Sequence, residues 1–201
     1  MVMVKVKICG LSRHNDIDAV NNEKPDYIGF IFAGSRRRIS PQQALELRKK
    51  LSPDIIPVGV FVDEMIENII SLVQDDVIDI IQLHGFEDEE YISRLKELTD
   101  KPVIKAIAVQ KEGDMQRWAA SSADYLLVDN IVAGSGQIFN WDLIGKINKP
   151  FFLAGGLNIE NIIEAITKTK PFAVDVSTGV ETDGFKDHAK IREFIRRARN
   201  V

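Results

Sequence analysis

Two side chains that could exchange protons stand at the ends of two apolar runs. Cys9, the only cysteine among 201 residues, follows Val4–Ile8, and Asp129 follows Tyr125–Val128. A free cysteine is more often a small buried hydrophobe, but nearby cations or dipoles can bring its pKa toward neutrality, and its thiolate is a base. Asp129 either caps a loop or lies at a polar opening. Together the two groups suit proton-shuffling chemistry, such as isomerisation of a sugar phosphate.

Two glycine-containing turns form a second candidate site. Gly155 and Gly156 follow one apolar run, and Thr178 and Gly179 follow the next. Glycine lets backbone N–H groups approach an anion closely, and such groups bind phosphate beside helix N-termini. Either turn alone would be an ordinary tight turn, but the two together predict a phosphate site.

Further polar residues lie close to the same positions along the chain. Arg37, within Arg36–Arg38, could hold a second anionic group of a substrate, while at least two of these arginines should be solvated. Gln82 and His84 end another apolar run, and His84 is either a site residue or a hydrogen-bonded structural histidine. Asp175 either lines the mouth of the site or accepts hydrogen bonds from its neighbours.

Eight short apolar runs alternate with turns and helix-like segments. Because the runs are nearly continuous rather than alternating, they indicate strands that are covered on both faces, as in parallel sheets. We expect strands over Val4–Ile8, Tyr27–Phe32, Ile56–Val62, Asp79–Leu83, Val103–Val109, Tyr125–Val128, Pro150–Leu153 and Phe172–Val176. We expect helices over Asp16–Asn21, Pro41–Arg48 (capped by Ser40), Asp88–Leu98, Trp141–Ile147, Asn158–Ile166 and Asp187–Ala198.

Eight such units predict an α/β protein, a single (β/α)₈ TIM barrel domain spanning residues 1–201. An open doubly wound sheet is the competing fold, but it would leave two or three units over. In such barrels the active site lies where the strands end, and phosphate often binds after the seventh and eighth strands. The candidate residues therefore belong at one mouth.

The composition excludes several classes of function. A net charge of −4 disfavours nucleic acid as a partner, and no apolar run approaches the ~20 residues of a membrane span. One cysteine allows no intrachain disulfide, and the three histidines lack the paired spacing of a zinc site. We expect a cytoplasmic protein with a small-molecule substrate and no metal. Monomer and homodimer both remain open.

At this point a family resemblance emerges, carried by motifs that span residues 5 to about 195. The chain resembles the phosphoribosylanthranilate isomerases of tryptophan biosynthesis in the segments KICGL (7–11), VGVFVDE (58–64), IIQLHG (80–85), LLVDN (126–130), FFLAGGLN (151–158) and VDVSTGVE (174–181). The first and last of these distinguish that family from related phosphate-binding barrels.

The resemblance implies an Amadori rearrangement of N-(5′-phosphoribosyl)anthranilate to 1-(2-carboxyphenylamino)-1-deoxyribulose 5-phosphate, without a cofactor. It implies that Cys9 is the general base, Asp129 the general acid and Arg37 the partner of the anthranilate carboxylate. The residues expected to contact the rest of the substrate are Gln82, His84 and Asp175, with the phosphate on Gly134, Ser135, Gly136, Gly155, Gly156, Thr178 and Gly179.

Three alternatives remain. Another sugar-phosphate aldose–ketose isomerase, such as that of the histidine pathway, would pair two aspartates, which Cys9 disfavours. A non-catalytic phosphate-binding barrel would need neither Cys9 nor Asp129. A Schiff-base aldolase would use Lys105. We interpret Lys105 instead as a side chain that fills the barrel with its amine toward the mouth.

Overall fold

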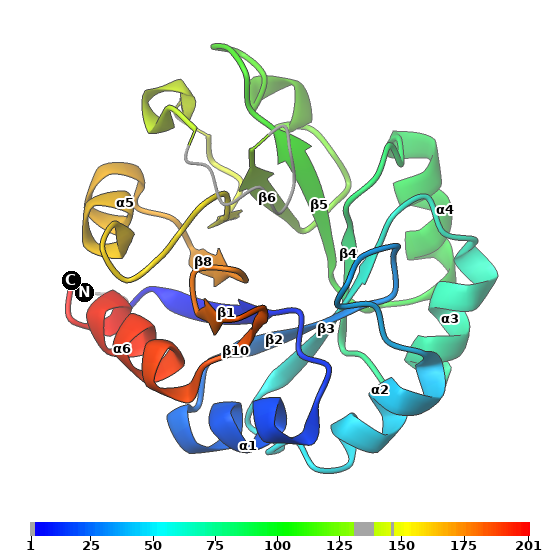
Figure 1. Cartoon of the computed structure of the whole chain (residues 1–201). Coiled ribbons are helices and arrows are strands. Elements are labelled where there is room, and N and C mark those ends of the chain that lie inside the picture. The colour runs from blue at the N-terminus through cyan, green and yellow to red at the C-terminus, as the bar shows by residue number, and fades with distance from the viewer. Residues whose placement is uncertain (1–2, 131–138, 146) are drawn as a thin grey trace.

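Eight parallel strands pair in chain order and close into a barrel, which confirms the predicted fold (Figure 1). The computed structural model describes residues 3–130, 139–145 and 147–201. The strands are β1 (Lys5–Cys9), β2 (Tyr27–Ile31), β3 (Ile56–Phe61), β4 (Ile80–Leu83), β5 (Val103–Ala108), β6 (Tyr125–Asp129), β7 (Phe151–Leu153) and β8 (Ala173–Val176).

Helices cover the outside of the barrel (Figure 1). They are α1 (His14–Glu23), α2 (Pro41–Arg48), α3 (Ile66–Gln74), α4 (Glu89–Leu98), α5 (Ile162–Thr169) and α6 (His188–Arg199). Ser40 caps α2 by accepting a hydrogen bond from the Gln43 N–H, as its place before Pro41 predicts. In the described part of the chain, no helix is long and apolar enough to cross a membrane.

Some of the expected helices are wrong. After β5 and β6 the described residues form only the 3₁₀ turns η1 (Gln116–Trp118) and η2 (Trp141–Leu143), so the helix expected over Trp141–Ile147 is one short turn. The helix expected from Asn158 begins at Ile162, because the Asn158 side chain accepts hydrogen bonds from the N–H groups of Glu160 and Asn161. Asparagine in this position favours a turn over a helix. The helix α3 over Ile66–Gln74 was not predicted from the sequence.

A two-stranded hairpin between β8 and α6 was also not predicted. It pairs β9 (Glu181–Thr182) with β10 (Phe185–Lys186) through Asp183 and Gly184, both with positive φ. This backbone is the type I′ turn for which Asp-Gly is a strong signal. The hairpin brings Glu181 and Lys186 beside the mouth of the barrel.

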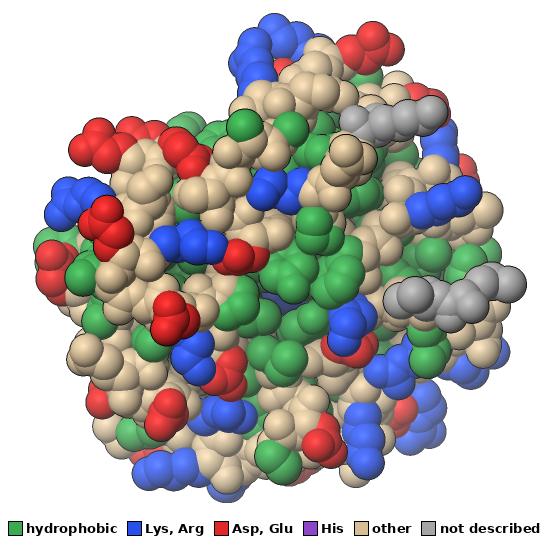
Figure 2. Space-filling view, turned by 180° about the vertical axis from the view of Figure 1, so that it is seen from behind, with side chains coloured by type: hydrophobic (Ala, Val, Ile, Leu, Met, Phe, Trp, Pro, Cys, Tyr) green, Lys and Arg blue, Asp and Glu red, His purple; other side chains and the backbone are tan. Residues whose placement is uncertain are grey.

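Aromatic rings fill one end of the barrel. Tyr27, Tyr125, Phe152 and Phe172 pack with ring centroids 5.1 to 5.7 Å apart, near the start of their strands. Seen from behind, the molecule carries an apolar centre surrounded by charged side chains of both signs (Figure 2). The polar side chains of the barrel interior lie nearer its other end, where the strands finish.

Candidate active site

A cavity opens where the strands end, and it collects most of the residues that the sequence singles out. Its lining includes Cys9, Arg37, Gln82, His84, Asp129, Gly155, Gly156, Asp175 and Thr178. Gly179 does not line the cavity and lies behind it, against the turn after β7. The expected phosphate ligands Gly134, Ser135 and Gly136 lie outside the described residues.

Cys9 ends β1 and is buried, with 7% of its surface exposed. Burial raises the pKa of its thiol above the usual value, and the positive charges of Lys7 and Lys186 only partly oppose that shift. The pKa of Cys9 is therefore raised, whereas the nearby cations alone would lower it. The resting thiol is protonated at neutral pH, and a thiolate forms only when a proton leaves this buried group.

Gly29 on β2 makes room for the thiol. It pairs with Cys9 across the two strands, and a Cβ added to Gly29 would lie 2.6 Å from the Cys9 Sγ. We expect Gly29→Ala to push the sulfur aside and lower kcat by about 10²-fold, because a 1 Å misplacement can have that effect. Steady-state kinetics would measure the change.

Gly59→Ala is the matched control for this substitution, because Gly59 is also a strand glycine, and a Cβ there meets Ile78 and Phe61 rather than a cavity residue. We expect its kcat to stay near that of the wild type. A Gly29→Ala protein with normal kcat would contradict the assignment of a reacting thiol to this position.

Asp129 ends β6 and faces His84 across the cavity. Its Oδ1 accepts a hydrogen bond from the Asn130 N–H at 2.7 Å, and its Oδ2 lies 3.4 Å from the His84 Nε2. The other ring nitrogen, Nδ1, is 2.9 Å from the Gln82 Nε2. Asp129 is therefore held at the polar mouth rather than used as a helix cap.

Lys7 is a buried cation of the site, and sequence reasoning missed it. Its Nζ lies 2.8 Å from both the Asp175 Oδ2 and the Gln82 Oε1. Burial lowers the pKa of Lys7, but Asp175 is the main group that raises it and the net direction is upward, so the ammonium stays charged. The available signal was the strand period of two, which places Lys7 and Cys9 on the same inner face of β1.

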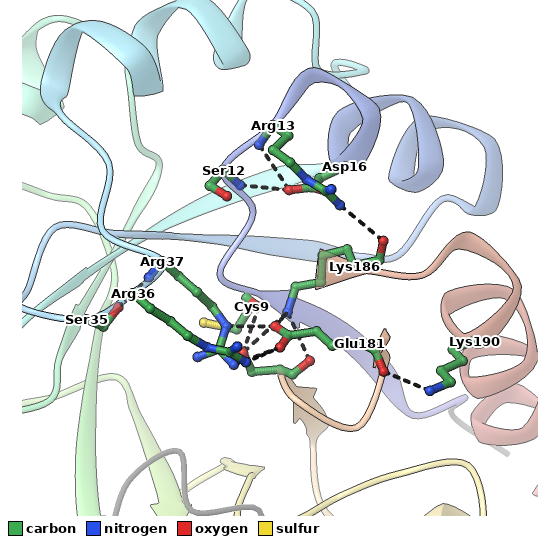
Figure 3. A network of polar contacts seen from close by, with 11 residues as sticks. Cys9, Ser12, Arg13, Asp16, Ser35, Arg36, Arg37, Glu181, Lys186 and Lys190 are labelled. Carbon is green, nitrogen blue, oxygen red and sulfur yellow. Dashed lines mark hydrogen bonds and ion pairs between the residues drawn. The ribbon is translucent and has the colours of Figure 1, made fainter. Parts of the chain in front are cut away.

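Arg37 is held by a carboxylate from the hairpin (Figure 3). Its Nε and Nη2 donate to the two oxygens of Glu181 at 2.7 and 2.9 Å, and Lys186 donates to the same Oε1 at 2.7 Å. Burial would raise the pKa of Glu181, but the bonds from Arg37 and Lys186 outweigh it and lower the pKa. Sequence reasoning missed Glu181 and Lys186 because it missed the hairpin.

The two glycine turns are adjacent in space. Gly155 and Gly156 have positive φ values of 80° and 70°, which side chains with a Cβ rarely adopt. Gly179 bridges to Asn158, and a Cβ on it would overlap the carbonyl oxygen of Leu157. The turns after β7 and β8 therefore depend on glycine to approach each other, as a shared anion site requires.

Lys105 forms a buried ion pair and does not line the cavity that contains Cys9 and Asp129. Its Nζ lies 2.7 Å from the Glu87 Oε2 and 2.7 Å from the Gly85 carbonyl oxygen, and its side chain is only 3% exposed. An ammonium in a buried ion pair is a poor nucleophile, because the amine must lose its proton and its partner first. The arrangement favours the interpretation of Lys105 as a structural side chain.

A closed parallel barrel with titratable side chains at the carboxyl mouth is the arrangement of TIM-barrel enzymes. Comparison with known proteins narrows this class. Residues 6–197 match the family model described as N-(5′-phosphoribosyl)anthranilate (PRA) isomerase. The chain therefore belongs to the N-(5′-phosphoribosyl)anthranilate isomerase family, which confirms the resemblance found in the sequence.

Individual relatives agree over nearly the whole chain. The N-(5′-phosphoribosyl)anthranilate isomerase of Endomicrobium trichonymphae is 50% identical, covering 99% of this chain and 100% of the relative. A solved phosphoribosyl anthranilate isomerase in complex with reduced 1-(o-carboxyphenylamino)-1-deoxyribulose 5-phosphate is 37% identical, with a TM-score of 0.87 and coverage of 99% and 100%. Solved monomers generated from the dimeric isomerase of Thermotoga maritima are 37% identical, with a TM-score of 0.86 and the same coverage.

Proposed function

We propose that the chain converts N-(5′-phosphoribosyl)anthranilate to 1-(2-carboxyphenylamino)-1-deoxyribulose 5-phosphate in tryptophan biosynthesis, with Cys9 as general base and Asp129 as general acid. The observation that carries the assignment of roles is that both side chains end barrel strands and line one cavity. No metal or organic cofactor takes part in this reaction.

The two groups act in sequence on the ribose. Asp129 gives a proton to the furanose ring oxygen, the bond from that oxygen to C1′ breaks, and an iminium forms. Cys9, as thiolate, then takes the proton from C2′, and the electron pair of that bond forms an enolamine. The enolamine tautomerises to the ketone. One acid and one base suffice, because no atom enters or leaves the substrate.

Other residues of the cavity fit the remaining parts of the substrate. Arg37 uses two of its five N–H donors on Glu181, so others can bind the anthranilate carboxylate. The Asp175 Oδ1 is buried and has no hydrogen-bond partner within the described residues, so it is suited to accept a ribose hydroxyl. The glycine turns after β7 and β8 hold the phosphate, and the sequence adds Gly134, Ser135 and Gly136 as further phosphate ligands.

The pair of Cys9 and Asp129 sets a dependence on pH. The reaction needs Cys9 and Asp129 to share one proton, which the thiol holds at rest and Asp129 holds in the active form. The pair loses this proton as the pH rises through the pKa of the thiol. Because burial raises the Cys9 pKa, we expect kcat/KM to fall only above the ordinary thiol range of ~8.5. A pH–rate profile would measure this, and Cys9→Asp should move the alkaline fall to lower pH. A profile that falls near neutrality would contradict it.

Glu181 should act on substrate affinity through Arg37. In Glu181→Gln the carboxylate that holds Arg37 and compensates the buried Lys186 is lost. We expect KM to rise about tenfold, equivalent to ~1.4 kcal/mol, while kcat changes little. The matched control is Glu193→Gln, which removes a carboxylate shared by Arg196 and Arg197 on the outer face of α6. A KM that does not move would show that Glu181 does not position Arg37.

The proposed activity can be tested against its nearest alternative. Anthranilate and phosphoribosyl pyrophosphate form the substrate in situ, and its fluorescence disappears as the isomerase consumes it. We expect rapid loss with this protein and little turnover of the histidine-pathway aldose. The reverse preference would assign the chain to that aldose–ketose isomerase, and no turnover of either by folded protein would reject catalysis.

We propose one barrel domain over residues 1–201 and a cytoplasmic location, because tryptophan biosynthesis uses soluble phosphorylated intermediates. We propose a monomer or a homodimer, because the solved Thermotoga maritima relative was obtained as monomers of a dimeric enzyme. Sedimentation of the purified protein distinguishes the two states.

A further inference from the structure

A chain of polar contacts crosses the barrel from the candidate base to the candidate acid. Lys7, which interacts electrostatically with Cys9, donates to the Gln82 Oε1 at 2.8 Å. The Gln82 Nε2 lies 2.9 Å from the His84 Nδ1, and the His84 Nε2 lies 3.4 Å from the Asp129 Oδ2. These contacts thus join residues on β1, at the end of β4 and on β6 that are far apart in the sequence.

The direction of every contact follows from Lys7. An ammonium has three donors and no acceptor, so Gln82 must turn its carbonyl oxygen toward it. The amide NH₂ then faces His84, and because this group only donates, the Nδ1 of the neutral imidazole must be the acceptor. The ring proton is therefore on Nε2, the nitrogen that faces Asp129.

Burial of Lys7 and Gln82 strongly favours this orientation of the Gln82 amide. Lys7 is 0% exposed and Gln82 is 1% exposed. A reversed amide would place its NH₂ against the ammonium, so that two buried donors face each other without an acceptor, and mismatched buried polar groups are strongly disfavoured. Asp175, 2.8 Å from the same ammonium, balances its charge and adds no competing donor when ionised.

We propose that Lys7 and Gln82 are positioning residues that fix His84 in the Nε2–H tautomer, so that a ring N–H faces the carboxylate of Asp129. This deepens the proposed function, because it rests on Asp129 acting as the acid. Asp129 becomes a carboxylate when it gives its proton to the ring oxygen, and an N–H on the nitrogen 3.4 Å from its Oδ2 stabilises the charge as it develops. Gln82 acts through His84 and not by contact with substrate.

Gln82→Glu exchanges the donor and acceptor roles in the contact with His84. The shape of the side chain changes little. A carboxylate can still accept from Lys7, but it also accepts from His84, so the ring proton moves to Nδ1 and a lone pair on Nε2 faces Asp129. We expect kcat to fall at least tenfold with KM nearly unchanged, because the loss concerns the acid and not binding. A rise in KM with normal kcat would instead make Gln82 a substrate-binding residue and overturn the proposal.

The tautomer can be measured without any activity. Long-range proton–nitrogen correlation spectra of ¹⁵N-labelled protein distinguish the two ring nitrogens, and the chain has only three histidines. His84→Gln identifies the signal of His84. We expect the wild type to carry the neutral ring proton on Nε2, Gln82→Glu to carry it on Nδ1, and the exposed Gln42→Glu to match the wild type.

The result separates this proposal from the proposed function. An Nδ1–H tautomer, or a mixture of tautomers, in the wild type would overturn the proposal even if the isomerase is fully active. An Nε2–H tautomer in a protein without isomerase activity would support the positioning and reject the activity. Should Gln82→Glu fail to fold, Gln82→Met tests the same point, because without the amide the tautomer should no longer be fixed.

Discussion

Replacement of Cys9 by alanine should lower kcat by about 10²- to 10⁴-fold, the range that a positioned general base supplies. The thiol is the titratable group that ends β1 at the cavity, and alanine leaves the buried position apolar. The C2′ proton would then have to leave to water or to a weaker base. Steady-state turnover of N-(5′-phosphoribosyl)anthranilate would measure the loss, and circular dichroism would show that the barrel is intact.

Two further variants distinguish the effect of losing the base from the effect of changing the shape of the side chain. Cys9→Ser keeps a side chain of similar size but is a much weaker base, so it should be nearly as slow as alanine. Cys9→Asp restores a base and should recover part of the rate. If Cys9→Ala turns over within a few-fold of the wild type, Cys9 is core packing and another group removes the proton.

Asp129→Asn should produce a loss of the same order, about 10²- to 10⁴-fold in kcat, because asparagine has no proton to give to the ring oxygen. The amide can still accept from the Asn130 N–H, so the backbone around β6 should keep its course. We expect KM to change little. The same fluorescence assay measures both constants.

Asp124→Asn is the matched control for this loss. Asp124 lies just before β6 at the opposite end of the strand, where it pairs with Lys96 and accepts from the Val103 N–H. Its replacement should lower thermal stability and leave kcat near the wild-type value. Equal losses of kcat in Asp124→Asn and Asp129→Asn would mean that the effect comes from the fold and not from acid catalysis.

Much of the barrel could be predicted because its signals are local. Strands buried on both faces require continuous apolar runs, and the runs locate all eight strands with ends within two residues of those observed. Ser40 and Pro41 place the start of α2 for an equally local reason, a cap followed by a fixed φ. The order of strands around the barrel then brings Cys9, Asp129 and the glycine turns to one mouth.

The remainder depends on contacts that no local pattern carries. Lys7 and Gln82 are 75 residues apart on strands that do not pair, so only the closed barrel brings them together. The expected helices failed at Asn158, whose side chain holds a turn, and over Trp141–Ile147, where the described residues form only one 3₁₀ turn. The hairpin did have a local signal, Asp183-Gly184, and recognising it would have placed Glu181 beside Arg37.

The most direct test of the two roles is a single-turnover measurement with substrate that carries deuterium at C2′. If Cys9 takes the C2′ proton, Cys9→Asp should be slowed by deuterium at least as strongly as the wild type, because the weakened base makes that transfer limiting. If Asp129 opens the ring, Asp129→Asn should lose most of the isotope effect, because a step that does not break the C2′ bond becomes limiting. A large isotope effect in Asp129→Asn together with none in Cys9→Asp would contradict both assignments.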